Sequence, residues 1–276
     1  MRVKIPSDLS GINSNRARDH FWFVVNVLCS GGAKAEPVKE LEIRMAGMAF
    51  EVQINGAKVI FHFADWKELR SNEDCSGYAA RFKFHYDPAR TYPCTWHPFS
   101  PISFLDWSEY SRLSRAVHHD ASGLCIGNRQ TPRGEALDRR IAVRRALLDV
   151  YGKDLVYEVL DQRNFWEEAG RLLVSVCVPG ARNDILDRGQ IQYMGLGVCT
   201  ISPKLTIGLP WGKTLEPGIH YVECATDYSN ILRTVLWCRG HRAECAAIGA
   251  NAKRKFEECL TGEKLRKWVL EKLGQN

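Results

Sequence analysis

One stretch of the chain, residues 182–222, constrains the fold more than any other. It predicts a short helix over Asp184–Leu196, ended by Gly197, since glycine takes the left-handed conformation at little cost. The β-rich run Val198–Ile201 is typical of a buried parallel strand. A loop rich in proline and glycine, residues 203–218, follows the strand. Because α/β sheets present ligands at the carboxyl ends of their strands, this order predicts an α/β fold with a ligand site here.

The same order of features resembles the donor-binding segment of GT-B glycosyltransferases. The resemblance rests on Asp187-Arg188 ahead of small residues and a strand, on Leu215–Val222, and on Asp227 after it. Over roughly residues 123–260 the chain is similar to the capsule-associated O-glucosyltransferases and related bacterial and phage glycosyltransferases. This resemblance implies two Rossmann-like domains facing a cleft, with the N-terminal domain truncated. It also implies metal-independent transfer of a sugar from a nucleotide-diphosphate donor, a UDP-sugar, to a hydroxyl acceptor.

The length of 276 residues suits two domains of modest size or one large domain. Four prolines make residues 87–104 irregular and extended, which indicates a crossing between domains. Together with the family resemblance, this boundary implies an acceptor-side Rossmann-like domain over residues 1–110. A nucleotide-sugar donor-binding Rossmann-like domain is predicted over residues 111–276.

Hydrophobic periodicity predicts the elements of the first domain. Arg2–Ile5 is a strand, and a helix follows from Asn15 with an apolar stripe of Phe21, Val24, Val25 and Leu28. Phe50–Ile54 and Lys58–Phe63 read as paired strands. Tyr78–Tyr86 alternates polar and aromatic residues, which predicts a half-exposed strand.

The second domain alternates helical and strand patterns. A helix is predicted over Glu135–Tyr151, with its inward face made by Leu137, Ile141 and Leu148. Leu172–Val178 is almost entirely apolar, as parallel core strands are. Three further helices are predicted over Asp227–Arg239, Arg242–Cys259 and Glu263–Leu273.

Composition narrows the environment of the protein. The sequence has no apolar run long enough to cross a membrane and no signal-peptide core after Met1, which predicts a cytoplasmic protein. The ten cysteines occur without any C-x-x-C spacing. Several lie in apolar runs, which favours reduced, buried thiols over disulfides or a metal site. The cysteines therefore do not predict a metal site, and the family resemblance implies a nucleotide-sugar donor without a metal or a permanently bound cofactor.

Candidate donor contacts are arginines next to predicted strand ends. Arg188 can bind a diphosphate bidentately, or it can form a surface salt bridge with Asp184 or Asp187. Arg129 and Arg133 lie in a loop before a helix, where backbone amides and a guanidinium together bind anions. The family resemblance implies a donor-ribose contact at Gln192, where related enzymes often carry a glutamate. As an alternative, Gln192 is a helix-surface amide.

The acceptor side needs a group that takes a proton from the hydroxyl. Asp65 follows a predicted strand and precedes Trp66, as the family resemblance implies for the base, although it could simply cap a helix. Lys83 could neutralise the donor phosphate, or be an ordinary exposed lysine. His220 could contact the sugar or the base, or start a strand. Lesser candidates for the base are His62, Asp87 and His97.

Six arginines fall between residues 129 and 145, and the net charge is +6. The helical ones, Arg139, Arg140, Arg144 and Arg145, are predicted to form a solvated face, although an anionic macromolecule could use them. Two alternatives to an ordinary glycosyltransferase therefore stay open. One is a DNA-modifying glycosyltransferase acting on a hydroxymethylated base. The other is a non-catalytic, basic nucleic-acid-binding α/β module.

Overall fold

The structure is a computed structural model, which describes residues 1–12, 15–44, 48–64, 76–116, 120–126, 135–152, 155–156, 161–180, 182 and 184–275. By its internal contacts the chain divides into two compact units. Unit 1 comprises residues 1–105, 207–214 and 259–276, and unit 2 comprises residues 106–206 and 215–258.

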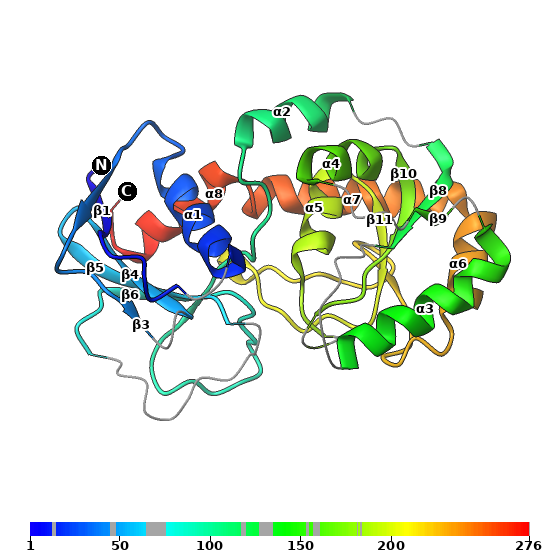
Figure 1. The fold of residues 1–276 in the computed structure, drawn as a ribbon, viewed down its shortest axis with the longest axis horizontal. Helices are drawn as coiled ribbons and strands as arrows, with labels where there is room; N and C mark the ends of the chain where they lie inside the picture. The colour runs from blue at the N-terminus through cyan, green and yellow to red at the C-terminus, as the bar shows by residue number, and fades with distance from the viewer. Residues whose placement is uncertain are drawn as a thin grey trace. The chain divides into compact units, whose positions relative to one another are not determined.

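Unit 1 is built on a mixed β-sheet in the order β2-β1-β4-β5-β6-β7, with β3 beside β4 (Figure 1). The β1–β2, β5–β6 and β6–β7 pairs are parallel, whereas β1–β4, β3–β4 and β4–β5 are antiparallel. The strands are β1 (Val3–Pro6), β2 (Ala35–Val38), β3 (Ile43–Arg44), β4 (Ala49–Ile54), β5 (Ala57–His62), β6 (Ala80–Lys83) and β7 (His97–Pro98).

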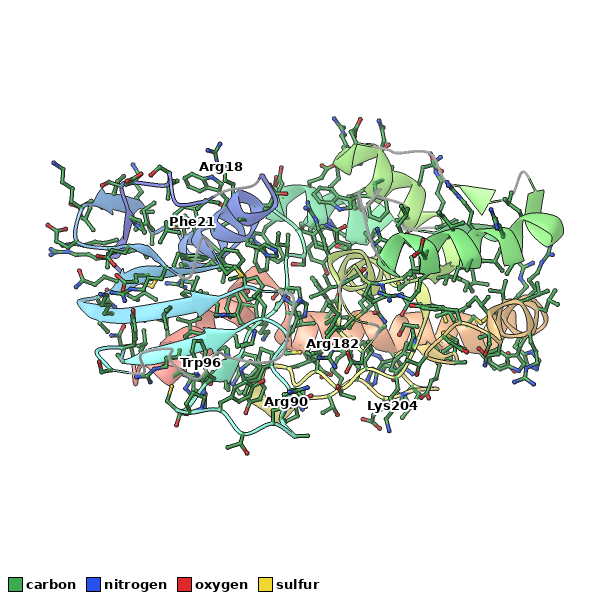
Figure 2. The ribbon with its side chains drawn as sticks, turned by 60° about the horizontal axis from the view of Figure 1, so that its bottom comes forward. Arg18, Phe21, Arg90, Trp96, Arg182 and Lys204 are labelled. Carbon is green, nitrogen blue, oxygen red and sulfur yellow. The ribbon has the colours of Figure 1, made fainter. Side chains whose placement is uncertain are left out.

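Two helices of unit 1, α1 (Asn15–Cys29) and α8 (Gly262–Lys272), are in contact with each other. Helix α1 carries the predicted apolar stripe: Phe21 is buried, whereas Arg18 on the same helix is exposed (Figure 2). The Phe21 ring meets Phe50 of β4 at 5.0 Å between centroids. Phe50, Phe61 and Phe82 then stack in turn across β4, β5 and β6, so one face of the sheet is an aromatic core.

The opposite face of this sheet is also covered. Trp96 packs with Ala49 and Ile60 in a buried cluster, joined by several tyrosines. As a result, β6 is buried apart from the half-buried Arg81. The prediction of a half-exposed strand there is wrong, because aromatic side chains of an irregular segment enclose the face that the alternation assigned to water.

Unit 2 contains a sheet in the order β12-β11-β10-β8-β9. The β8–β9, β8–β10, β10–β11 and β11–β12 pairs are all parallel. Numbered along the chain this is the doubly wound order 2-1-3-4-5, whose switch point lies between its first and third strands. The strands are β8 (Asp120–Ile126), β9 (Leu155–Val156), β10 (Leu172–Val176), β11 (Cys199–Ser202) and β12 (Val222–Glu223).

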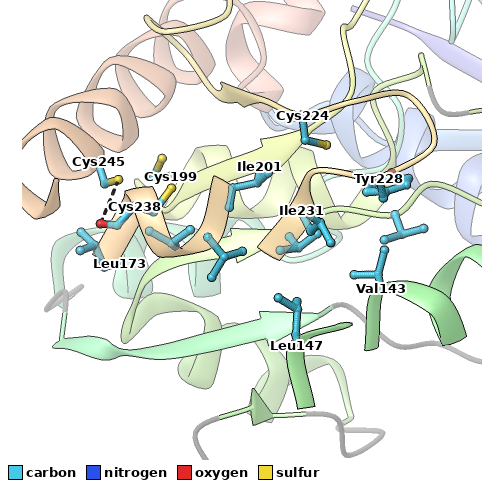
Figure 3. Close-up of a cluster of buried hydrophobic side chains, with 14 of the residues drawn as sticks. Val143, Leu147, Leu173, Cys199, Ile201, Cys224, Tyr228, Ile231, Cys238 and Cys245 are labelled. Atoms are coloured by element: carbon cyan, nitrogen blue, oxygen red, sulfur yellow. Dashed lines mark hydrogen bonds between the residues drawn. The ribbon is translucent and has the colours of Figure 1, made fainter. Parts of the chain in front are cut away.

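The helices of unit 2 are α2 (Trp107–Ala116), α3 (Glu135–Tyr151), α4 (Gln162–Gly170), α5 (Arg188–Leu196), α6 (Ile231–Gly240) and α7 (Arg242–Cys259). Helices α3 and α6 contact each other, and both feed one buried cluster with strands β10 and β11 (Figure 3). From α3 that cluster takes Val143 and Leu147. The predicted inward face of α3 is therefore wrong for Ile141 and Leu148, which are 39% and 38% exposed.

Helix α5 ends as the sequence predicted, with Gly197 in the left-handed conformation at φ 77°. It begins at Arg188 rather than Asp184, because Asp187 caps its first turn. Beside this turn, α7 approaches so closely that a Cβ on Gly249 would overlap the Gly197 carbonyl oxygen and lie 3.0 Å from the Cys199 nitrogen. Only a glycine in α7 permits that approach.

The α/β class is confirmed, and α7 has the predicted bounds. Two Rossmann-like halves are not confirmed, because the sheet of unit 1 mixes parallel and antiparallel strands. Unit 1 gives way to unit 2 between residues 105 and 106, whereas the predicted boundary lies at residues 110–111. Residues 207–214 and 259–276, which the prediction placed in the second domain, belong to unit 1. Gly208 donates to the Tyr86 carbonyl (2.9 Å), and the Trp211 indole, from the 3-10 turn η3 (Pro210–Gly212), donates to Glu271 (2.6 Å).

Candidate functional site

The carboxyl ends of β8 and β10 form the switch point of the unit 2 sheet. In doubly wound sheets, ligands bind outside the strand ends at such a point, because the chain leaves the two strands toward opposite faces. The segment after β10 runs from Cys177 to the cap residue Asp187. The segment after β8, residues 127–134, lies outside the described residues. The predicted anion contacts Arg129 and Arg133 fall in that segment and stay predictions.

The backbone leaving β10 is held by side chains from two different elements. The Tyr228 hydroxyl, from the loop before α6, donates to the Cys177 carbonyl (2.9 Å). The Arg140 guanidinium of α3 donates through Nε (3.1 Å) and Nη2 (2.9 Å) to the Val178 carbonyl. The prediction that Arg140 lies on a solvated face is therefore wrong. These bonds fix the backbone of residues 177–178 at the edge where a ligand would bind.

The N-terminus of α5 faces the same edge, since α5 follows β10 directly. The Asp187 carboxylate accepts a hydrogen bond from the Gln190 backbone nitrogen (2.8 Å), which satisfies one free amide of the first turn. Arg188 is half-buried at the first helical position. A guanidinium next to the positive end of a helix suits an anionic ligand.

The side-chain amides of the two glutamines on α5 lie in the protein interior. Gln192, the predicted ribose contact, is 3% exposed, so its side chain is enclosed. Gln190 is fully buried and donates to the Ser202 hydroxyl (3.1 Å) at the end of β11. The Gln190 hydrogen bond attaches α5 to β11. Gln192 is buried, and its contact with a ribose stays a prediction.

His220 lies in the turn before β12. Its side chain is 6% exposed, and Nδ1 accepts a hydrogen bond from the Glu216 backbone nitrogen (3.1 Å). Burial, together with the positive charge of Lys255, lowers the pKa of His220 despite the nearby acids. The ring is therefore neutral near pH 7 and already has a structural partner, which leaves Nε2 as the nitrogen that a ligand could use.

Two further cations lie along the loops that leave the unit 2 sheet. Arg182 pairs with Asp184 (Nε–Oδ1 3.3 Å), and its side chain is 40% exposed. The carbonyl of Asp184 in turn accepts from the Thr206 nitrogen (3.4 Å), which joins the loops after β10 and β11. Lys204, next to that junction, is exposed (Figure 2). We did not predict Arg182 or Lys204 as site residues, although the positions just after apolar strands were the available signal.

A second candidate region lies in unit 1, at the carboxyl ends of β5 and β6. His62 and Lys83 are neighbours in the parallel register, and the Lys83 Nζ lies 3.1 Å from the His62 Nδ1. They are only 1% and 0% exposed. With a protonated lysine, the imidazole must carry its own proton on Nε2. Such a buried amine is chemically unlike the exposed lysine that the strand pattern allowed.

The predicted base Asp65 lies outside the described residues, as does Trp66. The other candidates are engaged in local structure. Asp87 accepts a hydrogen bond from the Ala89 nitrogen (3.0 Å). Burial and the charges of Lys272 and Arg81 lower the pKa of His97 to about 4, so this imidazole is neutral at physiological pH.

The described cysteines are of two kinds, disulfide-bonded and free. Cys94 is disulfide-bonded, so the expectation of reduced thiols is wrong there. It is confirmed for the cysteines that are free: Cys29, Cys177, Cys199, Cys224, Cys238, Cys245 and Cys259.

Within the described residues, no cluster of histidine, cysteine and acidic side chains has the arrangement of a metal site. No helix among the same residues is long and apolar enough to cross a membrane.

Comparison with known proteins adds no family to this geometry. A scan against protein-family models and a search of curated protein sequences both found no match.

Proposed function

We propose that the chain is a glycosyltransferase that moves a sugar from a nucleotide-diphosphate donor, a UDP-sugar, to a hydroxyl acceptor. The observation that carries the proposal is Arg188 at the N-terminus of α5, at the carboxyl edge of a doubly wound parallel sheet. That edge is where α/β folds bind nucleotides, and an arginine at a helix N-terminus is suited to a diphosphate. The resemblance of residues 182–222 to GT-B donor segments points to the same site.

In this proposal, the donor-side cations stabilise the leaving diphosphate. Arg188, Arg129 and Arg133 bind its oxygens, and the N-terminal ends of α3 and α5 add their dipoles. A metal ion is then not required for charge neutralisation. Gln192 and His220 complete the donor contacts on the nucleotide side.

The acceptor base is Asp65, which follows β5. A carboxylate at the end of a strand can take the proton of the acceptor hydroxyl as the sugar is transferred. His62, the last residue of β5, lies three positions before Asp65 in the sequence, and its Nδ1 lies 3.1 Å from the Lys83 Nζ. The proposal assigns proton abstraction to Asp65 and a supporting electrostatic role to Lys83.

A screen of nucleotide sugars tests the proposal. Purified protein is heated in the presence of UDP-glucose, other UDP-, GDP- and dTDP-sugars, or the free diphosphates, with and without EDTA. A donor present at 100 times its Kd stabilises the folded state by about 2.7 kcal/mol, so one nucleotide class should raise the melting temperature. Slow donor hydrolysis, followed by chromatography of the released nucleotide, should accompany that shift.

Three outcomes separate the alternatives. Failure of every donor to bind or to be hydrolysed would contradict the enzyme. Binding of duplex DNA in that case would favour the non-catalytic nucleic-acid-binding module. Transfer of labelled sugar onto DNA that contains hydroxymethylated bases, but not onto unmodified DNA, would identify the DNA-modifying enzyme.

A further inference from the structure

The outer surface of α3 and α6 brings several partly exposed apolar side chains together on two neighbouring helices. The inner residues of both helices share one buried cluster on the unit 2 sheet, so their outer faces are neighbours (Figures 1 and 3). On α3, Ile141 and Leu148 lie two turns apart on the outside. On α6, Leu236 and Trp237 are 47% and 40% exposed.

Arginines are interspersed with these apolar side chains. Arg145 lies one turn from Ile141 on the exposed side of α3, and Arg233 lies one turn from Trp237 on α6. The sequence of α6, ILRTVLWCRG, contains two arginines and no acidic residue. We define the α3–α6 face by its exposed residues Ile141, Arg145, Leu148, Arg233, Leu236 and Trp237. This face is apolar and carries two arginines, and the exposed Asp138 of α3 lies one turn before Ile141.

The exposed tryptophan is held in one orientation. Its ring stacks on His241 with centroids 4.4 Å apart and 13° between the planes. His241 is tied back in turn through its Nδ1 to the Trp237 carbonyl (2.8 Å). A large aromatic ring fixed at the surface lowers the entropy cost of binding, because little rotamer freedom remains to be lost.

We propose that the α3–α6 face binds the surface of an anionic lipid bilayer. Exposed leucine, isoleucine and tryptophan side chains gain free energy by leaving water for the interface, where tryptophan is enriched. The interspersed arginines are complementary to acidic headgroups. Duplex DNA fits less well, because phosphates would satisfy the arginines while the apolar side chains stayed in water. The proposal adds a location for the protein to the proposed function and does not depend on it.

Vesicle co-sedimentation of the full chain tests this surface. We expect binding to phosphatidylcholine vesicles that contain phosphatidylglycerol, weaker binding at high salt, and little binding to phosphatidylcholine alone. Arg233→Gln should weaken binding about fivefold at low salt, which corresponds to roughly 1 kcal/mol per arginine. The double variant Leu236→Ser/Trp237→Ser should weaken it by at least about tenfold.

The matched controls lie on α1, in unit 1. Trp22 is 44% exposed and Arg18 is exposed, so Trp22→Ser and Arg18→Gln remove comparable groups and should leave vesicle binding unchanged. Since these side chains lie at the surface, every variant should keep the circular dichroism spectrum of the unmodified protein.

Several results would overturn the proposal. One is the absence of binding to anionic vesicles. Another is a loss of vesicle binding in the α1 variants equal to that in the α6 variants. A third is equally strong binding to neutral and anionic vesicles. Concentration-dependent dimers in light scattering that the Leu236→Ser/Trp237→Ser variant abolishes, without vesicle binding, would assign the face to a second copy of the chain. A DNA gel shift sensitive to Arg233→Gln, again without vesicle binding, would assign it to nucleic acid.

Discussion

The Arg140 side chain donates two hydrogen bonds to the Val178 carbonyl, from Nε at 3.1 Å and from Nη2 at 2.9 Å. This contact joins α3 to the first residues after β10, across 38 positions of the sequence. It turns one arginine of a basic helix away from solvent and toward the switch point of the sheet. The hydrogen bonds from Arg140 therefore hold the backbone at the candidate donor site in position.

Replacement of Arg140 should loosen that site. Arg140→Lys keeps the charge but loses the planar pair of donors, so we expect faster amide hydrogen exchange after β10 and a loss of about 1–3 kcal/mol in unfolding free energy. Arg145→Lys, on the exposed side of the same helix, is the control and should change neither quantity. Equal exchange rates in the two variants would show that the Val178 contact does not order the loop.

Removal of Arg188 should weaken donor binding. The loss of a charge-assisted contact to a diphosphate costs on the order of 1.5–3 kcal/mol, so Arg188→Ala should raise the Kd for the nucleotide at least about tenfold in calorimetry. Arg129→Ala should act in the same direction. Arg171→Ala is the control, because Arg171 is 65% exposed and pairs locally with Glu168. Unchanged affinity in both Arg188→Ala and Arg129→Ala would remove the basis for the donor assignment.

Asp65→Asn tests the acceptor base. The amide is nearly isosteric with the carboxylate but cannot accept a proton near pH 7, so turnover should fall roughly 10²–10⁴-fold while donor affinity stays the same. Turnover is measured by release of the nucleotide with saturating donor. Near-normal turnover would leave Asp65 with a capping role and make Asp87 the next residue to replace.

Glu51 should make the stability of unit 1 sensitive to acid. Burial disfavours its charged form, but hydrogen bonds from Tyr78, Lys58 and the Glu42 backbone nitrogen, together with Arg44, outweigh that effect and lower its pKa. A carboxyl with a lowered folded-state pKa stabilises the protein above its unfolded value of 4.5. That contribution is lost as the pH falls through the folded-state pKa.

Urea denaturation at several pH values measures this effect. We expect Glu51→Gln to reduce the unfolding free energy by about 1–3 kcal/mol at pH 7, with a smaller difference from the unmodified protein at pH 3. Glu42→Gln is the control, since the Glu42 side chain is 63% exposed and contacts Arg44 at 3.3 Å. A difference between Glu51→Gln and the unmodified protein that is the same at both pH values would contradict the titration of Glu51.

Gly249→Ala should destabilise unit 2 although alanine favours helix. The added methyl group would meet the backbone at Gly197 and Cys199, which cannot move without disturbing β11, so we expect a cost of about 1–3 kcal/mol or more. Gly240→Ala, with no neighbour within 4 Å of the new Cβ, should be neutral or slightly stabilising. Thermal unfolding of the two variants measures this difference, and equal melting temperatures would contradict a steric role for Gly249.

Patterns that act over a few residues were predictable. Examples are the apolar stripe of α1, the end of α5 at Gly197 and the bounds of α7. They depend on residues about one helical turn apart, so the local sequence is enough to predict them. The α/β class follows from the alternation of such elements. The sequence placed the ligand site after Val198–Ile201, at the end of β11, whereas the switch point of the sheet lies at the ends of β8 and β10, because the strand order is set only when the sheet forms.

What the sequence could not decide was which side of an element would be covered. Ile141 and Leu148 lie outside because α3 presents Val143 and Leu147 to the β-sheet. Lys83 is buried because an aromatic segment around Trp96 covers the second face of its sheet.

By itself, then, the sequence determined α1, the end of α5, the bounds of α7 and the α/β class, whereas α4, β2, β3 and β7 were not predicted. Tertiary structure decided that Lys83 meets His62, that Arg140 supports the exit of β10, and that α3 and α6 form an apolar, basic surface. The physical reason is one of range. Helix and strand preferences arise from neighbours within a few residues, whereas burial and side-chain pairing depend on residues that meet only once the chain has folded.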